Sequence, residues 1–331
     1  MAEVSIIIPV YNVAPYIRRC LDSVVAQTFQ DIECILIDDC ATDNSIMIVE
    51  EFVNSYQGRI SFKIIHHPLN SGLSAARNTG IKESTSTYLY FLDSDDTITP
   101  NCIETLFYLF SKYPDINFAQ GNILQENGEI SRYGFNNTIP EYINNKEDIY
   151  KYLLSIITTS AWNRLIRRKF IIENSLYFPV GIVHEDMYWM YFVAKKAAAA
   201  AFSNIGTYTY YINKGSILTS ISKEKRIERY TSRLKAACIY LEDMLHYYPN
   251  KFQRQYLALN LLSCLPELTA LHSLSNWLVF WKAVLNMSLK ISHRITVYQL
   301  SFIALLLPPA CFLMGQKRIR WRIQNVIVSK L

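Results

Sequence analysis

The chain is organised around one segment, Tyr88-Leu89-Tyr90-Phe91-Leu92-Asp93-Ser94-Asp95-Asp96, in which five apolar or aromatic residues lead directly into three carboxylates. The apolar run is short and rich in aromatic residues, which favours a buried strand over a helix. The carboxylates then stand at the carboxyl end of that strand. Three anionic groups so close together repel one another and resist ionisation unless a cation holds them.

The acidic part of this segment has two interpretations. Carboxylate oxygens suit Mg²⁺ or Mn²⁺, and Mg²⁺ is commonly held by one or two carboxylates together with substrate phosphates. Asp93 and Asp95 would then belong to a metal site that binds a phosphorylated ligand. Alternatively the segment is an acidic turn without a ligand, because Asp and Ser favour loops.

Strand and helix patterns alternate through the first hundred residues. We expect strands over residues 4–12, 32–37, 60–66 and 88–92 and helices over residues 15–26, 45–56 and 74–82. Such alternation predicts an α/β fold, a mostly parallel sheet with helices on both faces. Ligands of these sheets bind beyond the carboxyl ends of the strands. Asn12, Asp38, Asp39 and the acidic segment all fall at such ends.

The middle of the chain has a mixed pattern. We expect a helix over residues 103–110, a hairpin of residues 118–124 and 130–133 around Asn127-Gly128, and a basic helical stretch over residues 160–168. An aromatic helix follows His184, and the alanine run 197–201 is interpreted as its end. A Tyr-rich strand is expected over residues 207–212.

Several function classes lose support from what the sequence lacks. The ten glycines include no Gly-x-Gly pair, so neither the dinucleotide fingerprint nor the P-loop is present, and there is no Gly-x-Ser-x-Gly elbow. The seven scattered cysteines indicate free thiols in a reducing compartment. The net charge of +5 is mild, and no basic run before the C-terminus argues for nucleic acid.

Five motifs together resemble the family 2 glycosyltransferases, inverting enzymes of GT-A fold that use nucleotide-sugars. The resemblance covers roughly residues 3 to 220 and is specific because the motifs follow the family's order. The matching segments are Val4-Ser5-Ile6-Ile7-Ile8-Pro9-Val10-Tyr11-Asn12, Leu36-Ile37-Asp38-Asp39 with Thr42-Asp43-Asn44-Ser45, Asn70-Ser71-Gly72-Leu73-Ser74-Ala75-Ala76-Arg77-Asn78, Phe91-Leu92-Asp93-Ser94-Asp95-Asp96 and His184-Glu185-Asp186.

The resemblance implies roles for the residues that bind the donor. Asp38 or Asp39 would accept a hydrogen bond from the base, and Pro9, Tyr11 and Asn12 would line the base and ribose. Arg77 would lie near the diphosphate or the acidic cluster, or else pair with Asp93 at the surface. Asp95 would be the main ligand of Mg²⁺ or Mn²⁺, with Asp93 beside it and toward the sugar. Ser94 and Asp96 complete the nucleotide-sugar-binding set.

The resemblance also assigns a catalytic base. Inversion needs a group that takes the acceptor's proton on the side opposite the metal, and Asp186 matches the family's base. Its neighbour Glu185 would bind the acceptor or take over as base. The alternative is structural, since acids favour a helix N-terminus. The chain departs from the family at Cys40-Ala41, where Gly-Ser is usual, so we expect a reshaped turn.

After about residue 222 the pattern is helical. We therefore expect a catalytic domain over residues 1–220 and a helical region over residues 221–331. Ser273 to Lys290 is amphipathic, residues 295–315 carry no charge, and four basic residues follow. This region either lies on a membrane surface or packs on the catalytic domain or a second subunit. With no signal peptide at its start, the protein is expected in the cytoplasm, including the inner face of the cell membrane.

The sequence therefore predicts an inverting transferase that moves a sugar from a nucleotide-sugar, preferentially a UDP-sugar, to a hydroxyl of a glycan or lipid-linked glycan. A nucleotidyltransferase would share the sheet and the acids but needs a triphosphate site. A membrane-surface assembly protein with a decayed transferase domain is the non-enzymatic alternative.

Overall fold

The computed structural model describes residues 2–135, 139–157, 159–213, 223–244, 250–253, 256–257 and 260. The amphipathic, uncharged and basic segments of the expected tail, between residues 273 and 322, lie outside this part. Among the described helices, none is both long enough and apolar enough to cross a membrane.

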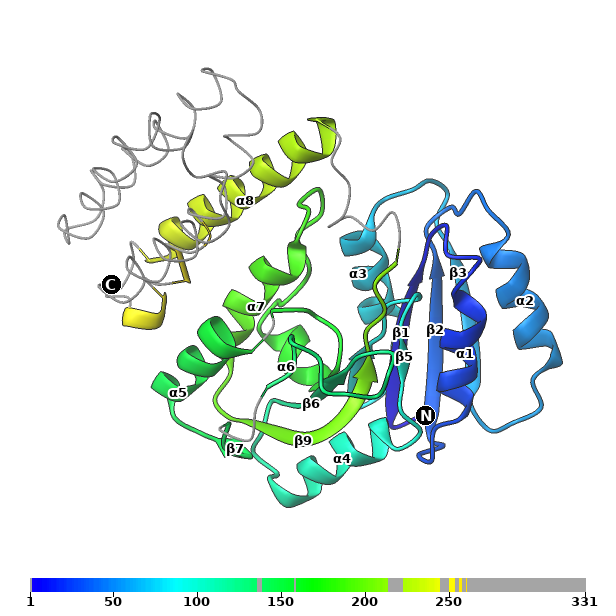
Figure 1. Ribbon diagram of the computed structural model, residues 1–331, viewed down its shortest axis with the longest axis horizontal. Coiled ribbons are helices and arrows are strands. Elements are labelled where there is room, and N and C mark those ends of the chain that lie inside the picture. The colour runs from blue at the N-terminus through cyan, green and yellow to red at the C-terminus, as the bar shows by residue number, and fades with distance from the viewer. Residues whose placement is uncertain are drawn as a thin grey trace. The chain divides into compact units, whose positions relative to one another are not determined.

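Nine strands of the described chain form one sheet, in the order β3-β2-β1-β4-β8-β6-β9-β5 with β7 paired to β9. Figure 1 shows β1, β2 and β3 side by side. Strands β1 to β4 are parallel to their neighbours in this group, whereas β8 is antiparallel to both β4 and β6. The strands are β1 Val4–Val10, β2 Ile32–Asp38, β3 Ser61–His66, β4 Tyr88–Phe91, β5 Thr97–Ile98, β6 Phe118–Leu124, β7 Tyr142–Ile143, β8 Arg164–Arg167 and β9 Ala200–Thr209.

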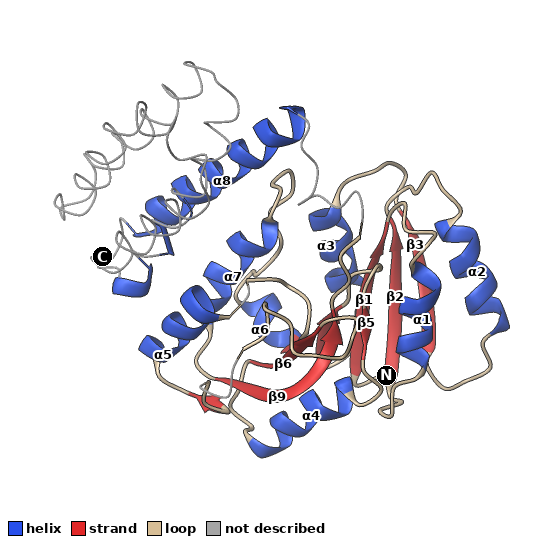
Figure 2. Cartoon of the chain, in the orientation of Figure 1, coloured by secondary structure: helices blue, strands red, loops and turns tan. Residues whose placement is uncertain are grey.

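Helices flank the sheet on both faces (Figure 2). Buried residues of α1, α2 and α4 share one core with Ile6, Ile8 and Tyr90, which point to a single face. On the other face α3 packs so closely on β1 that a Cβ atom at Gly80 would lie 2.3 Å from the Cγ2 atom of Ile7. The helices are α1 Ile17–Val25, α2 Ser45–Ser55, α3 Leu73–Glu83, α4 Cys102–Lys112, α5 Lys146–Lys151, the π-helix η1 Tyr152–Ile156, α6 Arg168–Glu173, α7 Glu185–Lys196 and α8 Lys223–Met244. The predicted α/β class is confirmed.

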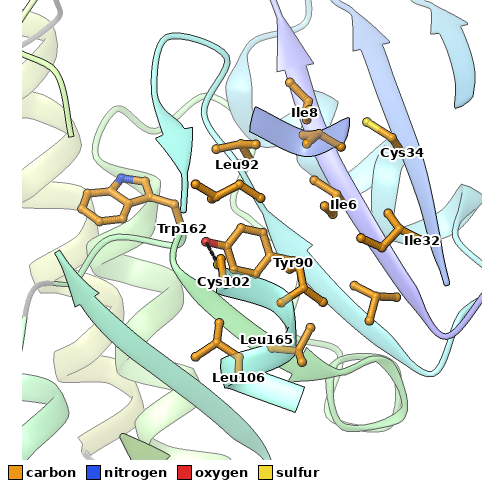
Figure 3. Packing of buried hydrophobic residues seen from close by; sticks show 14 of the residues in the cluster. Ile6, Ile8, Ile32, Cys34, Tyr90, Leu92, Cys102, Leu106, Trp162 and Leu165 are labelled. Atoms are coloured by element: carbon orange, nitrogen blue, oxygen red, sulfur yellow. Dashed lines mark hydrogen bonds between the residues drawn. The ribbon is translucent and has the colours of Figure 1, made fainter. Parts of the chain in front are cut away.

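The core under the acidic segment is built from both parts of the sheet (Figure 3). Tyr90 lies at its centre with Leu92 and Leu165 beside it, all shielded from water. The Tyr90 hydroxyl is 3.3 Å from the Cys102 sulfur on α4. Since every side chain of β4 is buried, the strand holds the following carboxylates at a fixed place on the sheet edge.

Two predicted helical segments are strands. The basic stretch 160–168 contains β8, whose buried residues Arg164, Leu165 and Ile166 sit between β4 and β6. The alanine run 197–201 is not the end of α7, because Ala200 and Ala201 begin β9 and pair with β6. Small side chains fit a fully covered sheet interior, and this packing overrides the helix propensity of alanine.

The expected hairpin forms only in part. Its turn is present, with Gly128 at φ 82° and its amide donating to the Gln125 carbonyl at 2.9 Å. Beyond it a single bridge joins Leu124 to Ile130, and residues 130–133 form no strand. Strands β8 and β9 take the pairing positions on the two sides of β6 instead.

The chain divides into two compact units. One consists of Met1–Gly181 with Glu185–Ser216, and the other of Ile182–His184 with Ile217–Leu331. All nine strands named above belong to the first unit, and α8 belongs to the second. The domain boundary at residue 220 stays a prediction.

Candidate active site

A buried arginine joins the acidic segment to the start of α7. The Arg77 guanidinium, on α3, donates from Nη2 to Asp93 at 2.8 Å and from Nη1 to Glu185 at 2.5 Å. Burial disfavours its charge, but Asp93 and Glu185 outweigh burial and raise the pKa of Arg77. Arg77 therefore lies at the acidic cluster, one of the two positions expected from the sequence, as a buried bridge between two carboxylates. The alternative, a pair with Asp93 at the surface, is wrong because the Arg77 side chain is buried.

Asp186 follows Glu185 in the first turn of α7 and is only half-buried. Its Oδ1 atom accepts a hydrogen bond from the Met187 amide at 2.8 Å. Burial and the Glu185 charge raise the pKa of Asp186 to about 7, against the opposing effects of Arg77 and the Met187 amide. A carboxyl group with such a pKa can take up a proton near neutral pH. Both acids also favour the N-terminus of α7 through its dipole, so a structural role stays open.

The other two acids of the segment are held by the end of β9 and the residues that follow it. Asp95 Oδ2 accepts from the Asn213 side chain at 2.9 Å. Both oxygens of Asp96 are bonded, Oδ2 by the Tyr208 hydroxyl at 2.7 Å and Oδ1 by the Tyr211 amide at 2.9 Å. Burial and the neighbouring carboxylates raise the pKa of Asp95 and of Asp96. Ser94, which precedes them, is buried. The nucleotide-sugar binding expected of Ser94 and Asp96 stays a prediction.

The donor set at this edge fits a hard divalent cation that arrives with a diphosphate. Within the described ranges, no three His, Cys, Asp or Glu side chains group closely enough to hold a metal alone. Asp93 and Asp95 nevertheless each keep an oxygen that no hydrogen bond to a described side chain occupies. Two carboxylates plus substrate phosphates are the usual environment of Mg²⁺. A cation here would also relieve the repulsion that raises the pKa of Asp95.

The last residue of β2, Asp38, and the next residue, Asp39, hold neighbouring loops in place. Asp39 accepts hydrogen bonds from the amides of Ser71 at 2.9 Å and Gly72 at 2.8 Å, and its Oδ1 is 2.8 Å from the His67 ring. Asp38 accepts from the Ala41 amide at 2.9 Å, and its other oxygen contacts His66. Both carboxylates lie at the carboxyl edge of the sheet, where the resemblance places the base of the nucleotide, and contact with that base stays a prediction.

The end of β1 presents the remaining residues that are predicted to line the base and ribose. Pro9 is buried inside β1, Tyr11 is 44% exposed, and Asn12 has a φ of 52°. The Asn12 side chain accepts a hydrogen bond from the Thr42 amide at 2.8 Å, so it ties β1 to the turn after β2. In that turn Cys40 has a φ of 61°, a left-handed conformation that costs a residue with a Cβ about 1 kcal/mol. The turn that Gly would make freely is thus made by Cys40.

Several residues of the site were not identified from the sequence. Arg19 on α1 donates to the Asp95 carbonyl at 2.5 Å, and its guanidinium lies 3.5 Å from the Tyr211 ring centroid. Asn213 and Tyr211 come from more than a hundred residues further along the chain. No local pattern marks these contacts, because the strand pairing of β5 with β9 creates them. The one available signal was the Tyr-rich composition around the end of β9.

Known proteins are similar to this chain in sequence. The chain is 32% identical over 225 residues to the glycosyltransferase GlyA of Streptococcus pneumoniae, a match that covers 65% of this chain and 31% of that relative. The chain therefore corresponds to about a third of GlyA's length.

Solved structures share the fold. TarS of S. aureus, residues 1–349 in complex with UDP-GlcNAc, superposes with a TM-score of 0.69 at 22% identity, over 89% of this chain and 83% of that one. The mannosyltransferase PcManGT of Pyrobaculum calidifontis, in complex with GDP-Man and Mn²⁺, gives a TM-score of 0.57 at 15% identity, over 99% and 85% of the two chains. These similarities confirm the GT-A fold.

The family itself is identified by sequence. The protein-family model of Glycosyl transferase family 2 matches residues 5–174, more than half of the chain. This range contains the acidic segment, Arg77 and the Asp38-Asp39 pair. The chain belongs to glycosyl transferase family 2.

Proposed function

We propose that this protein is an inverting glycosyltransferase that moves a sugar from a nucleotide-sugar, preferentially a UDP-sugar, to a hydroxyl of a glycan or lipid-linked glycan. The observation that carries the proposal is the Arg77 bridge, because it ties the acidic segment to the helix turn that holds Asp186. A single displacement requires carboxylates that hold the metal beside the donor's diphosphate, and a base on a separate element. The nucleotide-sugars in the TarS and PcManGT structures support the donor class.

The donor would lie along the carboxyl edge of the sheet. Pro9, Tyr11 and Asn12 would line its base and ribose, with Asp38 or Asp39 accepting a hydrogen bond from the base. Tyr11 is exposed and so can stack on a ring. Mg²⁺ or Mn²⁺, held by Asp95 and Asp93, would supply positive charge to the diphosphate leaving group.

The acceptor would be activated by Asp186. The acceptor hydroxyl gives its proton to the Asp186 carboxylate while its oxygen bonds to the anomeric carbon. On the opposite side the bond from that carbon to the diphosphate oxygen breaks, and the nucleoside diphosphate leaves with the electron pair. A base whose pKa lies near 7 is ionised in about half of the molecules at neutral pH, and it remains basic enough to accept the proton.

A binding screen tests the proposal. Thermal unfolding is measured with UDP-, GDP- and dTDP-sugars, each with Mn²⁺ and with a chelator. A bound donor at a hundred times its Kd should stabilise the fold by about 2.7 kcal/mol. Release of the nucleoside diphosphate is then followed for the best donor. A protein that binds no nucleotide-sugar in either condition, yet is folded, is not the transferase proposed here.

Asp95→Asn is expected to keep the fold but lose the Mn²⁺-dependent part of UDP binding. Asn is a weaker and uncharged metal ligand, while removing a charge that burial disfavours does not harm the fold. The measurement is the thermal shift produced by UDP with Mn²⁺ compared with that produced in chelator. Asp31→Asn, at an exposed carboxylate on the opposite edge of the sheet, serves as the control. Equal UDP binding by Asp95→Asn in both conditions would remove Asp95 from the metal site.

A further inference from the structure

A half-buried arginine on α1 contacts the backbone of the acidic segment. The Nη2 atom of Arg19 donates to the carbonyl oxygen of Asp95 at 2.5 Å. The guanidinium also lies over two aromatic rings, 3.5 Å from the ring centroid of Tyr211 and 5.3 Å from that of Tyr16. A cation in such a position is attracted by the ring. Arg19 therefore links α1, the segment after β4 and the residues after β9.

The residues after β9 hold the same segment by their own hydrogen bonds. The Tyr211 amide donates to Asp96 Oδ1 at 2.9 Å, and the Asn213 side chain donates to Asp95 Oδ2 at 2.9 Å. The carbonyl bonded by Arg19 belongs to the peptide group that joins Asp95 to Asp96. That peptide group is thus held by Arg19 on one side and through Tyr211 on the other. These contacts restrict the backbone of Asp95, and with it the direction of the Asp95 carboxylate.

Arg19 approaches the acids in a way that leaves their carboxylates available. In the described part of the chain it forms no ion pair with any of the three acids, whereas Arg77 bonds the Asp93 carboxylate directly. Its Nε atom is shielded from water and makes no hydrogen bond there. An unpaired buried N–H group costs stability, so the contacts of Arg19 are not those of a residue that serves stability alone.

We propose that Arg19 is a positioning residue of the metal site: through the Asp95 carbonyl and the Tyr211 ring, it keeps the Asp95 carboxylate in the direction in which it binds Mn²⁺ or Mg²⁺. The inference rests on the proposed function of Asp95 as a metal ligand. Groups that orient a metal ligand typically contribute about 10- to 100-fold to metal affinity. Arg19 would make this contribution although it is itself a cation.

Two effects of Arg19 on metal binding have opposite signs. Its positive charge repels a metal ion, so its removal would strengthen binding if repulsion were its only effect. Its hold on Asp95 favours binding, so its removal weakens binding if orientation dominates. Water screens the repulsion at a half-buried side chain, and we therefore expect the orienting effect to be the larger. The direction of the change distinguishes the two effects.

The test is a titration of the full chain with Mn²⁺ at a fixed concentration of UDP. It is read as the rise in melting temperature and, independently, as free Mn²⁺ by electron paramagnetic resonance. Arg19→Met should raise the Mn²⁺ concentration at half-saturation about tenfold or more, while UDP binding in chelator stays at the wild-type level. Tyr211→Leu, which keeps the amide bonded to Asp96, should raise it too. Since both variants break one contact, the double variant should need no more Mn²⁺ than the more affected single variant.

The neighbouring arginine is the matched control. Arg18, on the same helix, pairs with Asp22 and lies over the Phe52 ring at 5.0 Å from its centroid. Arg18→Met thus removes an equal charge and a similar ring contact away from the acidic segment, and it should leave the Mn²⁺ requirement unchanged.

The outcomes separate this inference from the proposed function. An unchanged or lower Mn²⁺ requirement in Arg19→Met, or an equal increase in Arg18→Met, overturns the role of Arg19. If Arg19→Met does not fold, Tyr211→Leu decides, and an unchanged requirement in that variant overturns the inference. A wild-type chain that binds UDP equally well with Mn²⁺ and with chelator instead rejects the proposed metal site, and the role of Arg19 there with it.

Discussion

Asp186→Asn is expected to lower sugar transfer by about 10²- to 10⁴-fold while the affinity for the UDP-sugar stays close to that of the wild type. The acceptor hydroxyl is a poor nucleophile until its proton is removed, and an amide cannot take that proton. The donor contacts proposed above are made by other segments, so binding should survive. Transfer rates and donor Kd values, measured side by side, check both parts.

The same substitution should stabilise the fold in a pH-dependent way. In the unfolded chain Asp186 titrates near 3.9, and in the folded chain at about 7. An acid whose folded-state pKa is raised destabilises the fold as the pH rises from the lower value to the higher one. Asp186→Asn should therefore raise the melting temperature at pH 8 and change it little at pH 4. Asp31→Asn, at an exposed site, should change it at neither pH.

The neighbouring acid provides the contrasting result. Glu185→Gln keeps an oxygen that can accept from Arg77, so we expect a smaller loss of transfer than in Asp186→Asn. Near-normal turnover in Asp186→Asn together with an inactive Glu185→Gln would move the base by one residue. Normal turnover in both would contradict a single displacement with a base on α7.

Arg77→Met is expected to destabilise the fold by about 3–5 kcal/mol at pH 8, because it leaves Asp93 and Glu185 without their shared cation. Met fills much of the arginine's volume, so the lost charge rather than a cavity dominates. At pH 5 the cost should be smaller, since two carboxylates without a counter-charge take up protons more readily. Urea unfolding at both pH values measures the difference.

The chain contains a matched ion pair for comparison. Arg18 and Asp22 pair on the surface of α1 at 3.2 Å, with more than half of each side chain exposed. Arg18→Met should cost no more than about 0.5 kcal/mol, because exposed pairs contribute little. A similar, small cost for Arg77→Met would mean that the buried bridge is not needed to hold the acidic segment to α7.

The fold of the first hundred residues could be predicted because its local signals agree. In β1 and β4 a continuous apolar run coincides with β-branched or aromatic residues, and polar residues follow at the end. A buried parallel strand has to look like this, since both of its faces are covered. The amino-acid pattern alone therefore indicates that Asn12, Asp38 and Asp93 lie at one edge of the sheet.

In the segment that contains β8, the spacing of the charged residues favours a helix, although the segment is a strand. Arg164 and Arg167 flank an apolar pair in β8, and this spacing resembles one face of a basic helix. As a strand, β8 buries Arg164 completely and lets Arg167 reach backbone carbonyls beyond the sheet. Charged residues in a central strand are costly, so the sequence pattern could not indicate one.

The pairing of Arg77 with Glu185 could not be predicted for a different reason. The two residues are 108 positions apart, and neither lies in a pattern that points to the other. Their contact depends on α3 and α7 covering the same face of the sheet, which only the strand order establishes. Both residues and their motifs can be identified from the sequence, but the ion pair between them cannot.

The position of β4 in the sheet has a consequence for synthesis on the ribosome. Its first neighbour, β1, is made long before it, but its second neighbour, β8, ends only at residue 167. When residue 100 of the nascent chain has just left the ribosome, one edge of β4 is therefore still unpaired. All four residues of β4 are buried in the finished protein. Such an edge is prone to pair with other chains. We expect truncated chains that stop before β8 to aggregate and to depend on chaperones.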